Sequence, residues 1–105
     1  PSRGRRTVLP QVHVFARIQP RPEDRPEVLA ALQALVPPTR AEAGCRRFEL
    51  NTGIDGDSAL YLVEIWDSAT DLTAHHALPH TIAAAKVIEG KLLAETEVVR
   101  MSASS

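Results

Sequence analysis

The chain reads Leu60-Tyr-Leu-Val-Glu-Ile-Trp-Asp-Ser-Ala-Thr-Asp-Leu-Thr-Ala-His-His-Ala-Leu-Pro-His80 in the stretch that decides its fold. The first seven residues alternate between two faces, as a strand does. Ser68-Ala-Thr-Asp71 then has the spacing of a capping box, in which a hydroxyl and an acid three residues later begin a helix. The helix is expected to run through His76 and to be interrupted at Pro79, because proline lacks the backbone donor. Three histidines, a glutamate and the only tryptophan lie here, so a site is expected here too.

The rest of the chain supplies three more strands and one more helix. Alternating residues indicate strands, and apolar residues at helical spacing indicate an amphipathic helix that Pro37-Pro38 should end or kink. Asp55-Gly56 is a turn signal, and Gly44 and Gly90 are typical of helix ends. The expected elements are strand Gln11–Ile18, helix Glu23–Val36, strands Cys45–Thr52 and Ala59–Trp66, a helix through His76 that resumes over Thr81–Glu89, and strand Glu95–Met101.

This order, β-α-β-β-α-β, predicts an α+β fold of the ferredoxin-like type. Its four strands form one antiparallel sheet, and both helices cover one face. Phe48 and Tyr61 are assigned to the core under the helices. The opposite face is expected to carry Phe15, Leu62 and Trp66 beside Arg17, Arg47, Glu49 and Glu64.

An exposed apolar patch ringed by charges usually marks an interface or a pocket. We therefore expect two copies of the chain to pack sheet face against sheet face, forming a homodimer. The two sheets together would make a dimeric α+β barrel.

Composition excludes several other classes of function. The 105 residues predict one domain over residues 11–101, with a flexible basic tail at 1–10 and a frayed end at 102–105. A net charge of −1 gives no footprint for nucleic acid, although Arg3, Arg5 and Arg6 make the tail basic. No apolar run is long enough for a membrane span, so no membrane partner is expected. The single cysteine, Cys45, is typical of a reducing cytosol, and a cytoplasmic protein is expected.

Three segments together resemble the antibiotic biosynthesis monooxygenase (ABM) family of the dimeric α+β barrel superfamily. They are Thr39-Arg-Ala-Glu-Ala-Gly-Cys-Arg-Arg-Phe-Glu-Leu50, Val63-Glu-Ile-Trp66 and Ala74-His-His-Ala-Leu-Pro-His80. The His75-x-x-x-Pro79-His80 pattern looks most like the quinol monooxygenase branch. The haem-degrading branch of the family uses a helix tryptophan and a histidine ten residues later. The matching positions here look like His75 and Ala85, so haem degradation is not expected.

The resemblance implies oxygenation of a small electron-rich aromatic, of the quinol, phenol or anthrone type, by O2 without metal, flavin or haem. A deprotonated phenol can pass one electron to O2, so the protein need supply only a dry pocket, a base and hydrogen bonds. Two rivals stay open. One is a non-catalytic dimer that binds a small molecule, and the other is a cofactor-free decarboxylase, isomerase or cyclase.

The candidate site residues each have a structural alternative. His75 is proposed as base, since histidine exchanges protons near neutral pH, and His80 as its support; either could be a packed helix residue. Trp66 is proposed to stack the substrate or to serve only as packing. A zinc site built from three histidines is disfavoured by their spacing. The expected substrate-binding residues are Trp66, Glu64, Asn51, Arg47 and Phe15. For Glu64 and Arg47, the structural alternative is an ion pair.

Overall fold

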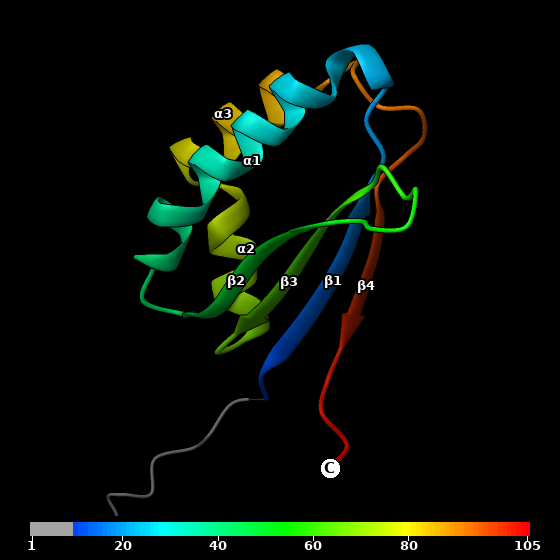
Figure 1. Ribbon diagram of the computed structural model, residues 1–105. Coiled ribbons are helices and arrows are strands. Elements are labelled where there is room, and N and C mark those ends of the chain that lie inside the picture. Colours follow the sequence, from blue (N-terminus) through cyan, green and yellow to red (C-terminus); the bar gives the residue numbers. More distant parts are fainter. Residues whose placement is uncertain (1–9) are drawn as a thin grey trace, which may run out of the picture.

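The computed structural model describes residues 10–105 (Figure 1). The basic tail predicted at residues 1–10 lies outside the described residues, apart from Pro10. The elements are β1 (Val12–Ile18), a 3₁₀ turn η1 (Pro22–Asp24), α1 (Arg25–Arg40), β2 (Cys45–Thr52), β3 (Leu60–Trp66), α2 (Ala69–His76), α3 (Pro79–Ile88) and β4 (Glu97–Met101).

The four strands form one antiparallel sheet in the order β2-β3-β1-β4. The helices α1, α2 and α3 all lie on one side of this sheet (Figure 1). None of the described elements covers the other side, which we call the open face. This arrangement confirms the predicted ferredoxin-like α+β fold. No helix in the described part of the chain is long and apolar enough to cross a membrane.

The two faces of β3 are the reverse of those predicted. Pairing with β1 sets Leu62 opposite Ala16, and Trp66 opposite Val12, which places them on the helix-covered face. Trp66 is fully buried there, whereas Tyr61 lies on the open face. Alternation alone could not decide between the faces, because both sides of β3 carry large apolar residues.

Prolines shape the helices differently from expectation. α1 continues through Pro37-Pro38 to Arg40 instead of ending before them. The donors that these prolines lack would have paired with the carbonyls of Gln33 and Ala34, and both of those residues are exposed, so water can replace the lost bonds. Pro79 begins α3 two residues earlier than predicted, since proline at the first helical position leaves no intrahelical bond unmade.

The capping box at the start of α2 acts as predicted, whereas Gly44 does not end α1, whose last residue is Arg40. The Ser68 hydroxyl accepts a hydrogen bond from the backbone N–H of Asp71 at 3.1 Å and donates to its carboxylate at 2.9 Å. Gly44 lies directly against this cap: a Cβ atom there would be 2.3 Å from Asp71 Cγ. Only glycine therefore lets the loop after α1 approach the start of α2 so closely.

Candidate functional site

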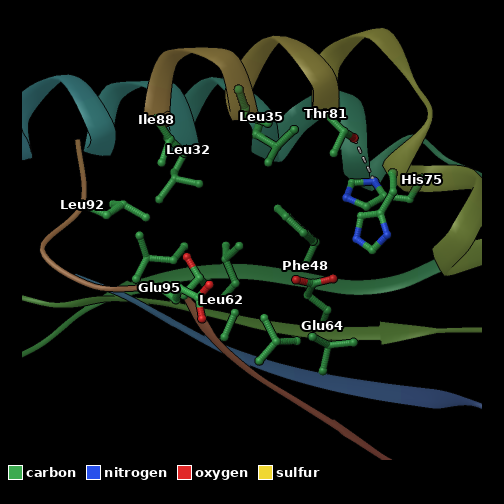
Figure 2. Close-up of a pocket in the computed structure, with 18 of the residues that line it drawn as sticks. Leu32, Leu35, Phe48, Leu62, Glu64, His75, Thr81, Ile88, Leu92 and Glu95 are labelled. Atoms are coloured by element: carbon green, nitrogen blue, oxygen red, sulfur yellow. Dashed lines mark hydrogen bonds between the residues drawn. The ribbon is translucent and has the colours of Figure 1, made fainter. Parts of the chain in front are cut away.

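A cavity of about 590 Å³ lies between the helices and the covered face of the sheet. Its wall is largely apolar, with side chains from α1, α3 and all four strands (Figure 2). This size and character are those of a site for a small molecule. The apolar residues that line it include Leu32, Leu35, Phe48, Leu62, Leu72 and Ile88.

Two ionisable side chains, His75 from α2 and Glu64 from β3, meet at one end of the cavity beside Phe48 (Figure 2). We call this region the His75 end. Both residues are buried, with 3% of His75 and 7% of Glu64 exposed. Buried ionisable groups are costly unless they are hydrogen-bonded, so their partners determine what they do.

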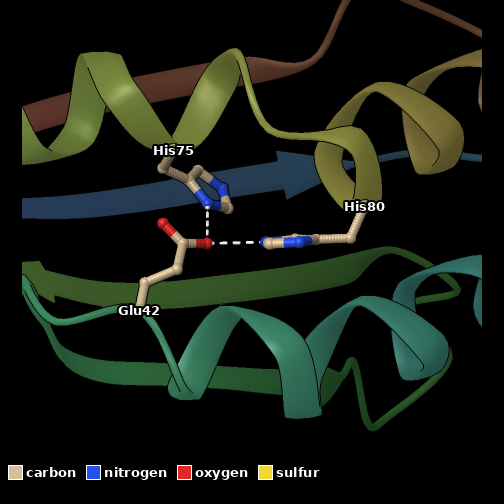
Figure 3. Close-up of side chains that lie close together, drawn as sticks. All are labelled: Glu42, His75 and His80. Atoms are coloured by element: carbon tan, nitrogen blue, oxygen red, sulfur yellow. Dashed lines mark hydrogen bonds and ion pairs between the residues drawn. The ribbon is translucent and has the colours of Figure 1, made fainter.

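His75 is held by Glu42, a residue of the loop after α1. Its Nδ1 atom lies 2.7 Å from Glu42 Oε2 (Figure 3). The Thr81 hydroxyl lies 3.3 Å from the same nitrogen. The imidazole ring also stacks against Trp66, with 4.7 Å between ring centroids. These contacts from three parts of the chain fix the orientation of the ring.

His80, at the start of α3, contacts the same oxygen. Its Nε2 atom lies 2.7 Å from Glu42 Oε2, so one carboxylate oxygen joins the two histidines (Figure 3). His80 does not line the cavity, whereas His75 does. His80 therefore acts on the cavity only through Glu42, as a support for the carboxylate.

The shared carboxylate decides the tautomer of His75. An ionised carboxylate only accepts hydrogen bonds. The two nitrogens that face it, Nδ1 of His75 and Nε2 of His80, must therefore be donors. Neutral His75 then carries its proton on Nδ1, which leaves Nε2 as the acceptor. No side chain within residues 10–105 hydrogen-bonds to Nε2. The His75 end thus holds an imidazole ring whose tautomer is set by a partly buried carboxylate, an arrangement that catalytic histidines also use.

Glu64 has a different environment. Its Oε1 atom accepts a hydrogen bond from the indole Nε1 of Trp66 at 2.8 Å. Burial raises the pKa of the Glu64 carboxyl, an effect that the Trp66 bond and nearby His75 only partly offset. Trp66 itself is fully buried and does not line the cavity, so it supports His75 and Glu64 rather than forming a wall for a ligand.

Glu42, His75 and His80 also have the donor types that divalent cations bind, and one ligand atom from each lies within 4.8 Å of the others. Both contacts to Glu42 have the length of charge-assisted hydrogen bonds and share one oxygen. The three side chains are thus joined by hydrogen bonds. His76, the third member of the zinc alternative, is exposed and takes no part in this cluster.

The remaining candidates, Phe15, Arg47 and Asn51, lie on the open face of the sheet, on the opposite side from Glu64 and Trp66. Phe15 pairs with Val63, and Arg47 and Asn51 pair with Ile65 and Tyr61, all on the open side. Arg47 contacts Glu49 at 2.9 Å, the ion pair that was the structural alternative. None of Phe15, Arg47 and Asn51 lines the cavity.

Sequence reasoning did not single out Glu42. The acid lies 33 residues before His75, in a loop, and the sequence carries no spacing that links the two. The only local signal is its position two residues before Gly44, the glycine that brings this loop against α2.

Fold and site together define a class: a ferredoxin-like α+β protein with a carboxylate-held histidine at one end of an apolar cavity. The chain belongs to the antibiotic biosynthesis monooxygenase family, whose family model matches residues 11–87.

Known proteins similar to this chain agree with that assignment. "Putative monooxygenase Rv0793" of Mycobacterium tuberculosis is 44% identical over 69 residues, which cover 66% of this chain and 67% of the relative. The solved structure of Rv0793 superposes with a TM-score of 0.85 at 34% identity, covering 90% of this chain and 96% of that one. PA3566 of Pseudomonas aeruginosa has a TM-score of 0.88 at 23% identity, covering 95% and 100%, and shares the fold.

Proposed function

We propose that this protein is a cofactor-independent monooxygenase that uses O2 to oxygenate a small electron-rich aromatic of the quinol, phenol or anthrone type. The observation that carries the proposal is the Glu42–His75 pair: Nδ1 of His75 lies 2.7 Å from Glu42 Oε2, and His75 lines a largely apolar cavity. The single cysteine, Cys45, is a free thiol and fits a reducing compartment such as the cytosol.

In this mechanism, Nε2 of His75 removes the acidic proton of the bound aromatic. The negative charge of Glu42 stabilises the imidazolium that forms. The aromatic anion passes one electron to O2, and the two radicals combine into a peroxide. Because the cavity wall is largely apolar, the charges interact more strongly there than they would in water.

The test is O2 uptake by protein treated with a chelator, over a panel of quinols, anthrones and naphthols. We expect saturable, protein-dependent uptake that chelation leaves unchanged. Turnover that continues under argon would instead indicate the decarboxylase, isomerase or cyclase alternative. Tight binding of panel compounds without any uptake would support the non-catalytic binding dimer and contradict the proposal.

We also propose that the protein is a homodimer in which two open sheet faces pack together. This face carries Phe15, Val99 and Met101, each more than a third exposed, with Tyr61 packed against Phe15 at a centroid distance of 5.6 Å. Burying such a patch against its own copy would remove this apolar surface from water.

Phe15→Glu should break that dimer, because it would bury an unpaired charge at the centre of the contact. We expect its dissociation constant to rise by about 100-fold or more, a change that needs only some 3 kcal/mol. Light scattering at micromolar concentration measures the mass. Ile54→Glu, in an exposed turn between β2 and β3, is the matched control and should stay dimeric. A wild type that is monomeric under these conditions would contradict the proposal.

A further inference from the structure

Glu64 is a buried carboxyl group without a cationic partner. Phe48 of β2 and Val14 of β1 flank it across the sheet. Within the described residues, no lysine or arginine nitrogen forms an ion pair with it, and its one side-chain hydrogen bond is the 2.8 Å contact from Trp66 to Oε1. Its other oxygen, Oε2, has no side-chain hydrogen bond within the described residues, and Glu64 is one of the residues that line the cavity.

The charged groups around Glu64 do not favour its ionised form enough to offset burial. From the helix side it faces His75, and from the loop after α1 it faces Glu42, which opposes a second negative charge. Arg100 of β4 lies in the same row two strands away, beyond Val14, and His76 borders the same cavity. Desolvation dominates and raises the pKa of the Glu64 carboxyl.

We propose that Glu64 is kept protonated and is the general acid that releases water from the oxygenated intermediate. The inference rests on the proposed monooxygenase function. A neutral acid fits the hydrogen bonds: Oε1 accepts from the Trp66 indole, and the proton on Oε2 is free to be given to a ligand in the cavity.

In the release of water, His75 accepts one proton and Glu64 donates another. After the substrate anion has combined with O2, the His75 imidazolium gives its proton to the peroxide. This forms a hydroperoxide, C–O–OH, on a carbon that still carries hydrogen, and it leaves Nε2 free to act as a base again. His75 Nε2 takes the C–H proton, and the C–H electron pair forms the carbonyl C=O bond. The O–O bond breaks, and the departing oxygen receives the Glu64 proton and leaves as water. Transfer of one proton from the His75 imidazolium to the Glu64 carboxylate restores both groups.

The kinetic test is Glu64→Gln, which keeps the size of the side chain and the acceptor for Trp66 but has no acidic proton. We expect O2 to be consumed while final product forms about 10²-fold more slowly, so that substrate hydroperoxide accumulates and is detected by mass spectrometry. Glu49→Gln, on the next strand but facing away from the cavity, is the matched control and should match wild type.

The outcomes separate this inference from the function on which it rests. If Glu64→Gln forms final product at the wild-type rate, the acid role is overturned and the monooxygenase stands. If the wild type takes up no O2 with any compound of the panel, the proposed function fails, and the acid role fails with it.

A second measurement needs no substrate. Below an ordinary carboxyl pKa of 4.5 both folded and unfolded chains hold the Glu64 proton. As pH rises above that value the unfolded chain releases it first, so the wild type loses stability until the folded pKa is passed. Denaturation of wild type and Glu64→Gln from about pH 4 to pH 8 should show the variant gaining relative stability as pH rises. A difference that does not change with pH would overturn the protonated state.

Discussion

We expect His75→Ala to lower the rate of the proposed O2-dependent turnover by about 10²–10⁴-fold, the loss that follows when a general base is removed. The alanine variant keeps the apolar cavity but has no group to take the substrate proton. The rate is measured by O2 consumption at saturating substrate. His13→Ala removes a histidine that lies on the open face of the sheet and does not line the cavity, and it serves as the control that should retain wild-type turnover.

The role of Glu42 is tested in the same assay. Glu42→Gln keeps an oxygen that can accept hydrogen bonds from both histidines but removes the negative charge, so the imidazolium that forms on His75 loses its stabilising partner and turnover should fall. If Glu42 acts only through His75, the double variant Glu42→Gln/His75→Ala should be no slower than His75→Ala alone. Additive losses would show that Glu42 contacts the substrate itself, and unchanged turnover in His75→Ala would contradict its role as base.

We expect Trp66→Ala to destabilise the protein by about 3–5 kcal/mol, because it removes the largest fully buried side chain of the core. The same change takes away the hydrogen bond to Glu64 and the ring that stacks on His75. For a domain of this size the melting temperature should fall by roughly 10 °C or more.

Thermal and urea denaturation measure the effect of the tryptophan. Ile54→Ala, at a side chain that is 76% exposed, is the matched control and should change stability by less than about 0.5 kcal/mol. A melting temperature of Trp66→Ala equal to that of the wild type would show that the indole is not part of the core. It would then have to be accessible to a ligand, as the stacking role predicted from sequence requires.

Much of the fold follows from local signals in the sequence. The capping box at Ser68, the turn at Asp55-Gly56 and the glycine stop at Gly90 all lie where predicted, and both turn residues and Gly90 adopt positive φ angles. Strand boundaries agree within two residues. These features depend on neighbouring residues, so they can be recognised without knowledge of the tertiary structure.

The faces of β3 and the partner of His75 could not be predicted in the same way. Leu62 and Trp66 alternate with Val63 and Ile65, so either side of the strand could have been the core. The register with β1 settles the choice, and it places Glu64 in the cavity and Phe15 outside it. The Glu42–His75 contact depends on how a loop after α1 meets α2, which is a property of the assembled fold.

The most direct test of the account is to mix the protein, without O2, with a panel phenol that it turns over in air, and to record the absorbance of the bound compound. If His75 is the base, wild type should show the spectrum of the deprotonated anion, and His75→Ala should show the neutral compound. An anion that forms equally well in His75→Ala, or a neutral compound bound to active wild type, would contradict the claim that His75 takes the substrate proton.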